Sequence, residues 1–171
     1  AGWSKIEGSY IRRELICPGQ IIAGGKRTNK VPCDYVLIYK GRKLAAVEAK
    51  KESLTYSEGV RQAKDYAQRL QCRFGYATNG HDIYQIDMRT GEEKLVDDYL
   101  SPQAMWDLTF EQGDKPEESF TTVWRDAFSS IPFEAKGDWA PRYYQENAIV
   151  NALEAIAEGK QRILLTLATG T

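Results

Sequence analysis

Two carboxylates and a lysine near the start of the chain have the types and spacing of a site for phosphate chemistry. Asp34 is followed along the chain by Glu48 and, two residues later, by Lys50. Carboxylate oxygens suit Mg²⁺, which can activate water and stabilise charge on a phosphate. A lysine ammonium can orient that water, help to deprotonate it, or neutralise the transition state. We take these three as candidate catalytic residues, and Asp34, Glu48 and the Ala49 carbonyl as candidate metal ligands.

A β-hairpin over residues 31–50 is the element that would bring these side chains together. Two apolar runs, at 36–39 and 44–49, flank a polar turn at 40–43. With the turn centred on Gly41–Arg42, Asp34 lies opposite the 48–50 region, and strand alternation places Glu48 and Lys50 on one face. Such a convergence of charges on strands that otherwise bury apolar residues is unfavourable unless it serves a function.

A helix is predicted directly after this hairpin, over residues 57–71. Its apolar stripe consists of Val60, Ala63, Ala67 and Leu70. Gln62 and Tyr66 are one turn apart and so share a face, which we place opposite the apolar stripe. An amide and a phenol on an exposed face suit the positioning of a DNA phosphate, although an ordinary amphipathic helix could carry the same two residues.

The combination resembles a known nuclease superfamily. Asp34 with Glu48-Ala49-Lys50 is similar to the signature of the PD-(D/E)xK nucleases, with Pro32 one place early, and Gln62 with Tyr66 is similar to the QxxxY motif of their RecB-like branch. The resemblance implies a Mg²⁺-dependent nuclease that cuts double-stranded DNA. An acid from the family's first helix cannot be assigned in this chain, since Glu7 and Glu14 are poor substitutes.

The end of the chain resembles the start of a motor domain. Gln145 precedes a predicted helix, and an apolar strand at 163–167 runs into Ala168-Thr169-Gly170-Thr171, which is similar to the beginning of a Walker A loop. In superfamily 2 helicases a glutamine placed like Gln145 contacts the adenine of ATP. A nuclease ahead of such a motor resembles HsdR, the restriction and translocation subunit of type I restriction–modification enzymes. That resemblance implies ATP in the full-length protein, and methyltransferase and specificity subunits as partners. Thr169, Gly170 and Thr171 would then bind nucleotide, but without the Walker A lysine we expect no ATP on this fragment.

The remaining patterns predict an α/β fold with a mixed central sheet flanked by helices. Short strands are expected at 74–78 and 82–87, joined by an Asn79-Gly80 turn. We expect an endonuclease domain at 1–100 and an ordered, helical connector at 101–140, where Trp106, Phe110, Trp124 and Phe128 would serve as anchors. The first helix and strand of a RecA-like motor would follow at 141–171.

Composition and charge agree with a nucleic-acid enzyme. Residues 1–80 carry 15 Lys+Arg and 7 Asp+Glu, a balance of +8, whereas the remaining 8 and 17 give −9. A basic half ahead of an acidic one is typical of a polyanion-binding domain followed by another module, although uneven surface charge alone would look the same. No apolar run is long enough to cross a bilayer. Cys17, Cys33 and Cys72 are predicted to be free thiols in the cytoplasm.

Two other functions remain open at this stage. The fold could serve as a non-catalytic DNA-binding or docking module of a helicase-like protein. A degenerate domain of that kind would be expected to have lost at least one of Asp34, Glu48 and Lys50, and all three are present. A RecB-like recombination nuclease is disfavoured because its nuclease normally lies after the motor. His81, the single histidine, is read as a loop residue rather than a general base.

Overall fold

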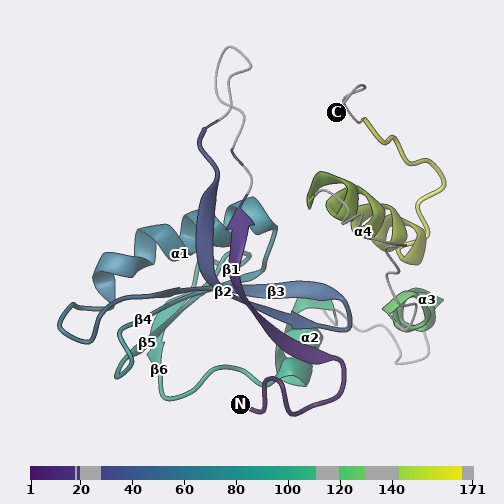
Figure 1. Cartoon of the computed structure of the whole chain (residues 1–171). Coiled ribbons are helices and arrows are strands. Elements are labelled where there is room, and N and C mark those ends of the chain that lie inside the picture. The colour runs from purple at the N-terminus through teal and green to yellow at the C-terminus, as the bar shows by residue number, and fades with distance from the viewer. Residues whose placement is uncertain (18, 20–27, 111–119, 130–142, 167–171) are drawn as a thin grey trace. The chain divides into compact units, whose positions relative to one another are not determined.

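The computed structural model describes residues 1–17, 19, 28–110, 120–129 and 143–166 (Figure 1). The chain divides into two compact units, Ala1–Gln112 and Gly113–Thr171. The interval 101–140, which we predicted as a connector, contributes a helix to each unit. No described helix is long and apolar enough to span a membrane.

The first unit is built on a six-stranded mixed sheet, which agrees with the predicted α/β class. Its strands follow the order of the sequence, and only β3 and β4 are parallel. Both edge strands, β1 and β6, escaped prediction because most of their side chains are exposed and charged residues interrupt their apolar ones, so their apolar pattern is weaker than that of the inner strands. The strands are β1 (Ser9–Cys17), β2 (Val31–Tyr39), β3 (Arg42–Ala49), β4 (Phe74–Thr78), β5 (Ile83–Asp87) and β6 (Glu93–Val96).

One helix packs on each face of this sheet (Figure 1). α1 (Ser57–Leu70) confirms the predicted helix and connects the parallel strands β3 and β4. It approaches β4 closely because Gly75 has no side chain, and a Cβ there would lie 3.2 Å from the Ala63 carbonyl oxygen. α2 (Pro102–Phe110) covers the other face, where Trp106 meets the ring of Tyr39 edge-on at 5.8 Å.

The register of the β2–β3 hairpin decides which residues share a face. The turn is Lys40-Gly41, both with positive φ, and so lies earlier than the predicted centre at Gly41–Arg42. Tyr39 pairs with Arg42, but an irregularity between Leu37 and Ile38 shifts the pairing by one residue, so that Tyr35 pairs with Val47. Without that shift Asp34 would fall opposite Val47, on the face away from Glu48. With it, Asp34 lies opposite Glu48, one position beyond the pair of Tyr35 and Val47, and the two carboxylates share one face.

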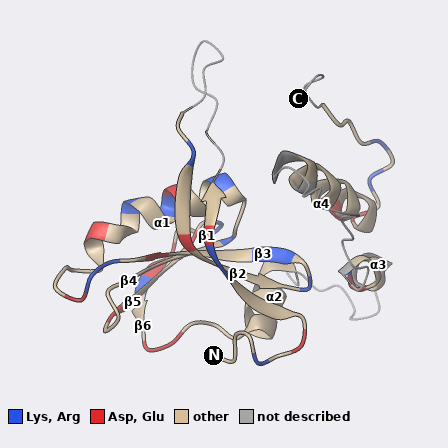
Figure 2. Ribbon diagram, viewed as in Figure 1, with Lys and Arg blue, Asp and Glu red and all other residues tan. Residues whose placement is uncertain are grey.

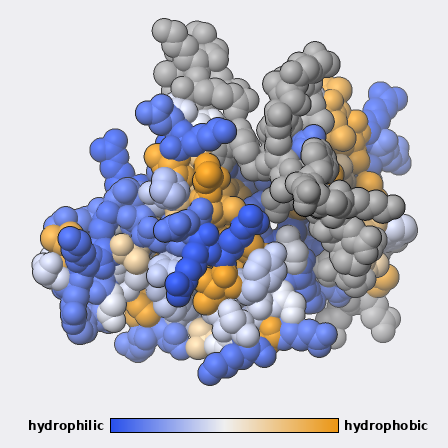
Figure 3. Space-filling view, in the orientation of Figure 1, coloured by the Kyte–Doolittle hydropathy of each residue, from blue (hydrophilic) through white to orange (hydrophobic). Residues whose placement is uncertain are grey.

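Charged and apolar side chains both reach the surface of this unit. α1 carries both basic and acidic residues (Figure 2), so the excess of positive charge in residues 1–80 does not form a uniformly basic stripe on this helix. Apolar side chains stand among hydrophilic ones on the face in view (Figure 3), and the exposed Ile11 and Ile16 belong to the edge strand β1. All three cysteines are buried and free, as predicted.

The second unit contains the helices α3 (Phe120–Ser129) and α4 (Tyr143–Ala157). They are held together by the ion pair between Arg125 and Glu154. The strand predicted over residues 163–167 is wrong for the part that is described, because residues 163–166 form no strand and Leu164 is 88% exposed. A strand exists only when a neighbour pairs with it, and no described segment does so here. Thr169, Gly170 and Thr171 lie outside the described residues.

Candidate active site

Asp34, Glu48 and Lys50 come together beneath α1, at the end of the sheet where β3 stops. The backbone N–H of Ala49 donates to Oδ2 of Asp34 at 2.8 Å, which ties the start of β2 to the end of β3. The Lys50 ammonium donates to Oε1 of Glu48 at 2.7 Å. The hairpin register and the strand alternation therefore gather the three candidate catalytic side chains in one place.

Glu48 is the most perturbed acid of this cluster. Its residue is only 4% exposed, and burial raises its pKa above the ordinary glutamate value. The hydrogen bond from Lys50 acts in the opposite direction, while the nearby Asp34 carboxylate raises the pKa further. The pair of acids thus shares a site in which negative charge is unfavourable unless a cation stands beside it.

The donor set fits a hard cation. Oε2 of Glu48 is buried and has no hydrogen-bond partner among the described residues, although Oε1 is satisfied by Lys50. A buried carboxylate oxygen without a donor is costly, and a metal ion is one way to satisfy it. Within the described part of the chain no cluster of three or more histidine, cysteine or acidic side chains could hold a metal. Two carboxylates, backbone carbonyl oxygen and water are a set that suits Mg²⁺.

Gln62 contacts this cluster through Lys50. Its amide oxygen accepts a hydrogen bond from the same ammonium group that bonds Glu48. The helix can come this near because residue 59 is glycine, and a Cβ there would lie 3.2 Å from Cγ of Glu48 and 3.4 Å from Cγ of Lys50. The geometry therefore places Gln62 beside the candidate catalytic lysine, Lys50.

Tyr66 does not lie on the exposed face that we predicted for it. It is 6% exposed and belongs to the apolar cluster under α1 that also contains Val36, Ala67 and Leu70. Tyr66 is three residues after Ala63 and four before Leu70, a spacing that puts it beside the apolar stripe. Burial, reinforced by the nearby Glu48 carboxylate, raises the pKa of its phenol to about 12. Its phenol therefore stays protonated beside the acids at neutral pH.

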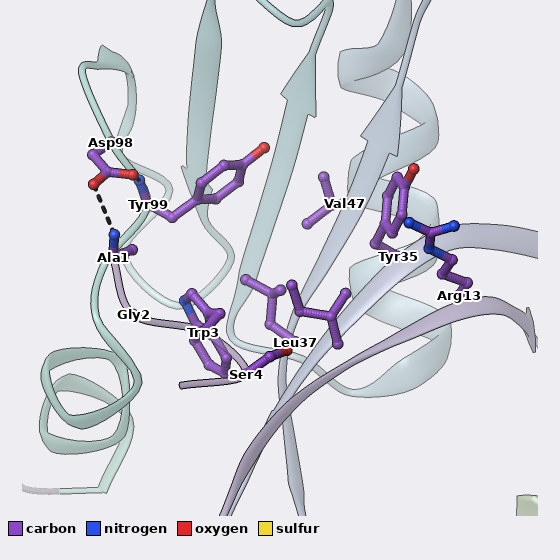
Figure 4. A pocket seen from close by; sticks show the side chains of 11 residues that line it. Ala1, Gly2, Trp3, Ser4, Arg13, Tyr35, Leu37, Val47, Asp98 and Tyr99 are labelled. Carbon is purple, nitrogen blue, oxygen red and sulfur yellow. Dashed lines mark hydrogen bonds and ion pairs between the residues drawn. The ribbon is translucent and has the colours of Figure 1, made fainter. Parts of the chain in front are cut away.

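A separate pocket of about 540 Å³ opens on the opposite face of the sheet (Figure 4). Its walls include Trp3, Tyr35 and Tyr99, and the Arg13 guanidinium lies 5.7 Å from the Tyr35 ring centre. Tyr35 directly follows Asp34 in the sequence but lines the other face, as strand alternation requires. Because this pocket contains none of the candidate catalytic residues, we do not assign the nuclease chemistry to it.

Sequence reasoning overlooked one polar residue at the same end of the sheet. Asn79 was read only as a turn residue, yet it is buried and its side chain bonds the backbone of two loops. The Asn-Gly dipeptide signalled a turn, but nothing local indicated the distant partner Leu54. In the second unit, Gln145 lies half-buried on α4.

Gly59→Ala should impair the site more than the fold. Alanine favours a helix by about 1 kcal/mol over glycine, which offsets part of the crowding, so the free energy of unfolding should change by less than about 1 kcal/mol. The new methyl group would nevertheless displace Glu48 and Lys50, and the DNA cleavage that the resemblance implies for the full-length protein should fall by roughly tenfold or more. Chemical unfolding and a plasmid-cutting assay measure the two quantities. Gln68→Ala, on the exposed side of α1, should change neither, and equal cutting by both variants would contradict the proposed packing.

Comparison with known proteins identifies the family of this chain. Residues 10–98, which contain the whole cluster, match the family model described as the N terminus of type I restriction enzyme R proteins. The chain belongs to this family. Its HsdR-type fold is also seen in the fragment structure of a proposed HsdR subunit of a type I restriction enzyme from Vibrio vulnificus YJ016. That structure superposes with a TM-score of 0.74 at 34% identity, over 99% of this chain and 32% of the other.

Two curated relatives are endonuclease subunits of type I restriction enzymes. The EcoAI subunit of Escherichia coli is 32% identical over 182 aligned positions, which cover 100% of this chain and 22% of the relative. The EcoKI subunit of E. coli strain K12 is 31% identical over 117 positions, or 61% of this chain and 9% of the relative. The chain thus spans about a fifth of the length of the EcoAI subunit.

Proposed function

We propose that this HsdR-type chain is a PD-(D/E)xK endonuclease domain that cleaves double-stranded DNA within an ATP-dependent restriction subunit. The observation that carries the proposal is the buried Oε2 of Glu48, which has no hydrogen-bond partner in the described part of the chain and lies near Asp34 and the Lys50 ammonium. A protein that used this region only for docking would have no reason to keep a second acid and a lysine converged on the buried carboxylate of Glu48.

Each residue of the cluster has a distinct role in this proposal. Asp34, Glu48 and the Ala49 carbonyl would hold Mg²⁺, which when bound supplies an activated water and offsets the charge on the phosphate. The Ala49 N–H fixes the Asp34 carboxylate. Lys50 orients the attacking water or neutralises the phosphate oxygens, and Gln62 keeps its ammonium at the site. Tyr66, on the buried side of α1, helps to hold Gln62 and the two acids in place.

The wider machine is proposed from the resemblance. Gln62, and Tyr66 less directly because of its burial, would help to position the DNA backbone. Gln145 on α4 would approach the adenine of ATP, and Thr169, Gly170 and Thr171 would belong to the phosphate-binding loop of the full-length RecA-like motor. Methyltransferase and specificity subunits would select the DNA site, since nothing in the cluster distinguishes one base from another.

Metal binding should depend on pH through Glu48. Only the ionised carboxylate can bind a cation, and the pKa of Glu48 is raised, so protons compete with the metal at a higher pH than for an ordinary glutamate. Below that pKa the affinity for Mn²⁺ or Mg²⁺ should fall by about tenfold per pH unit, and binding should release a proton. Calorimetric titration of the full-length protein in two buffers of different ionisation enthalpy measures both effects.

Two variants make this titration decisive. Glu48→Gln should remove the metal site and its proton release together. Glu52→Gln, which alters an exposed carboxylate of the loop after β3, should leave both unchanged. Unchanged metal binding by Glu48→Gln would exclude the proposed metal site and favour the docking function.

A further inference from the structure

Two loops meet at the end of the sheet that carries the nuclease cluster. The parallel strands β3 and β4 end in register at Ala49 and Thr78. The next backbone N–H, that of Lys50, donates to the Thr78 carbonyl at 2.7 Å. Asn79 therefore begins the turn into β5 directly beside the residue that carries the catalytic ammonium. On the other side, residues 51–56 lead from Lys50 to the start of α1.

The Asn79 side chain joins these two loops. Its Oδ1 accepts the backbone N–H groups of His81 at 3.1 Å and Asp82 at 2.8 Å, which shapes its own turn. Its Nδ2 donates to the Leu54 carbonyl at 3.0 Å, in the segment between Lys50 and α1. Asn79 is only 9% exposed, so these bonds are largely protected from competition by water. A side-chain amide carries an acceptor oxygen and a donor nitrogen, so it can make both kinds of bond here at once.

The segment held in this way determines where α1 begins. α1 starts at Ser57, and Gly59 and Gln62 in its first two turns contact Glu48 and Lys50. A shift of Leu54 would therefore move the helix relative to the end of β3. We propose that Asn79 is a positioning residue of the nuclease site, which holds the Leu54 carbonyl and thereby the start of α1 against Glu48 and Lys50. This inference rests on the proposed nuclease function.

A second contact between the same loops provides a matched control. The His81 imidazole lies 2.5 Å from the Glu52 carboxylate, but the two side chains are 66% and 76% exposed. Exposed pairs contribute little to the geometry of a site, because water and salt replace them readily. His81→Ala removes a link between the same two loops and leaves the buried Asn79 bond in place.

The test compares Asn79→Asp, Asn79→Ala and His81→Ala in the full-length protein. Asn79→Asp keeps the two acceptor bonds of the turn, replaces the donor to Leu54 by an acceptor and adds a negative charge, whereas Asn79→Ala removes all three bonds and adds no charge. Both Asn79 variants should slow DNA cleavage by roughly ten- to a hundredfold, because the residues of the nuclease site are displaced. ATP hydrolysis should stay within about twofold of the parent, because those residues take no part in it. Trypsin should also cut faster after Lys51, at the released segment, as measured by mass spectrometry of the digest. His81→Ala should match the parent protein in all three measurements.

The outcomes separate this inference from the proposed function. Parent-like cleavage by Asn79→Asp would overturn the positioning role, as would an equal loss by His81→Ala. A loss of ATP hydrolysis, or faster digestion at lysines throughout the chain, would mean that Asn79 only supports the fold, which also overturns it. Glu48→Gln is measured beside them: if it cuts normally, the proposed nuclease site fails. If it is inactive while Asn79→Asp cuts normally, only the positioning role fails.

Discussion

Lys50→Ala in the full-length protein should reduce DNA cleavage by about a hundred- to a thousandfold, the range expected when one transition-state partner is removed. The loss has two physical causes. The attacking water or the phosphate loses its cation, and Glu48 loses the only hydrogen-bond donor recorded for its buried carboxylate. The pKa of Glu48, which Lys50 now lowers, should rise further. ATP hydrolysis and translocation should persist, since the proposed motor would be a separate site. A plasmid-cutting assay and an ATPase assay on the same preparation measure the difference.

The neighbouring lysine supplies the control for this experiment. Lys51 is exposed, and its side chain makes no contact with the cluster that the structure records. Lys51→Ala should therefore cut DNA at a rate within a few-fold of the parent, about the change expected for one phosphate contact. Full cleavage by Lys50→Ala would remove Lys50 from the site and favour the docking function. Loss of ATP hydrolysis in a folded Lys50→Ala protein would mean that the two activities are coupled.

Tyr66→Ala should destabilise this chain by roughly 3–5 kcal/mol, the usual cost of deleting a buried aromatic ring. Tyr66 fills the core under α1 together with Val36 and Leu70, so removal of its ring would leave a cavity there. Gln62→Ala should change the free energy of unfolding by no more than about 0.5 kcal/mol, because Gln62 is exposed. It should still slow cleavage, since the Lys50 ammonium loses an acceptor. Chemical unfolding and cutting rates of the same variants measure the contrast.

A third variant isolates the phenol group of Tyr66. Tyr66→Phe keeps the ring and removes the hydroxyl, so it should cost only about 1 kcal/mol, the typical net value of one hydrogen bond. If Tyr66→Phe cuts DNA at the parent rate, Tyr66 acts only through packing. If Tyr66→Ala has the same free energy of unfolding as the parent protein, the ring is not buried, and Tyr66 lies on the exposed face of α1 that the sequence predicted.

The sequence by itself determined the local elements and the residues for the chemistry. The apolar period of α1 and the apolar runs of β2, β3 and β4 depend on neighbours within a few residues, and these elements were predicted to within a few positions. Asp34, Glu48 and Lys50 stood out because their residue types are unusual beside apolar strands. Tyr66 could also have been placed correctly, since its spacing from Ala63 and Leu70 lies in the sequence.

Only the tertiary structure decided how those residues meet. The one-residue shift between Leu37 and Ile38 brings Asp34 to the face of Glu48, and a bulge depends on how two strands pair and twist together. Both edge strands form because they add to an existing sheet, not through a strong apolar pattern of their own. The bond from Asn79 to Leu54 joins residues 25 positions apart, and its partner is a backbone carbonyl that any residue could provide. Contacts of this kind leave no pattern in the sequence, because their physical cause is the packing of loops that fold independently of one another.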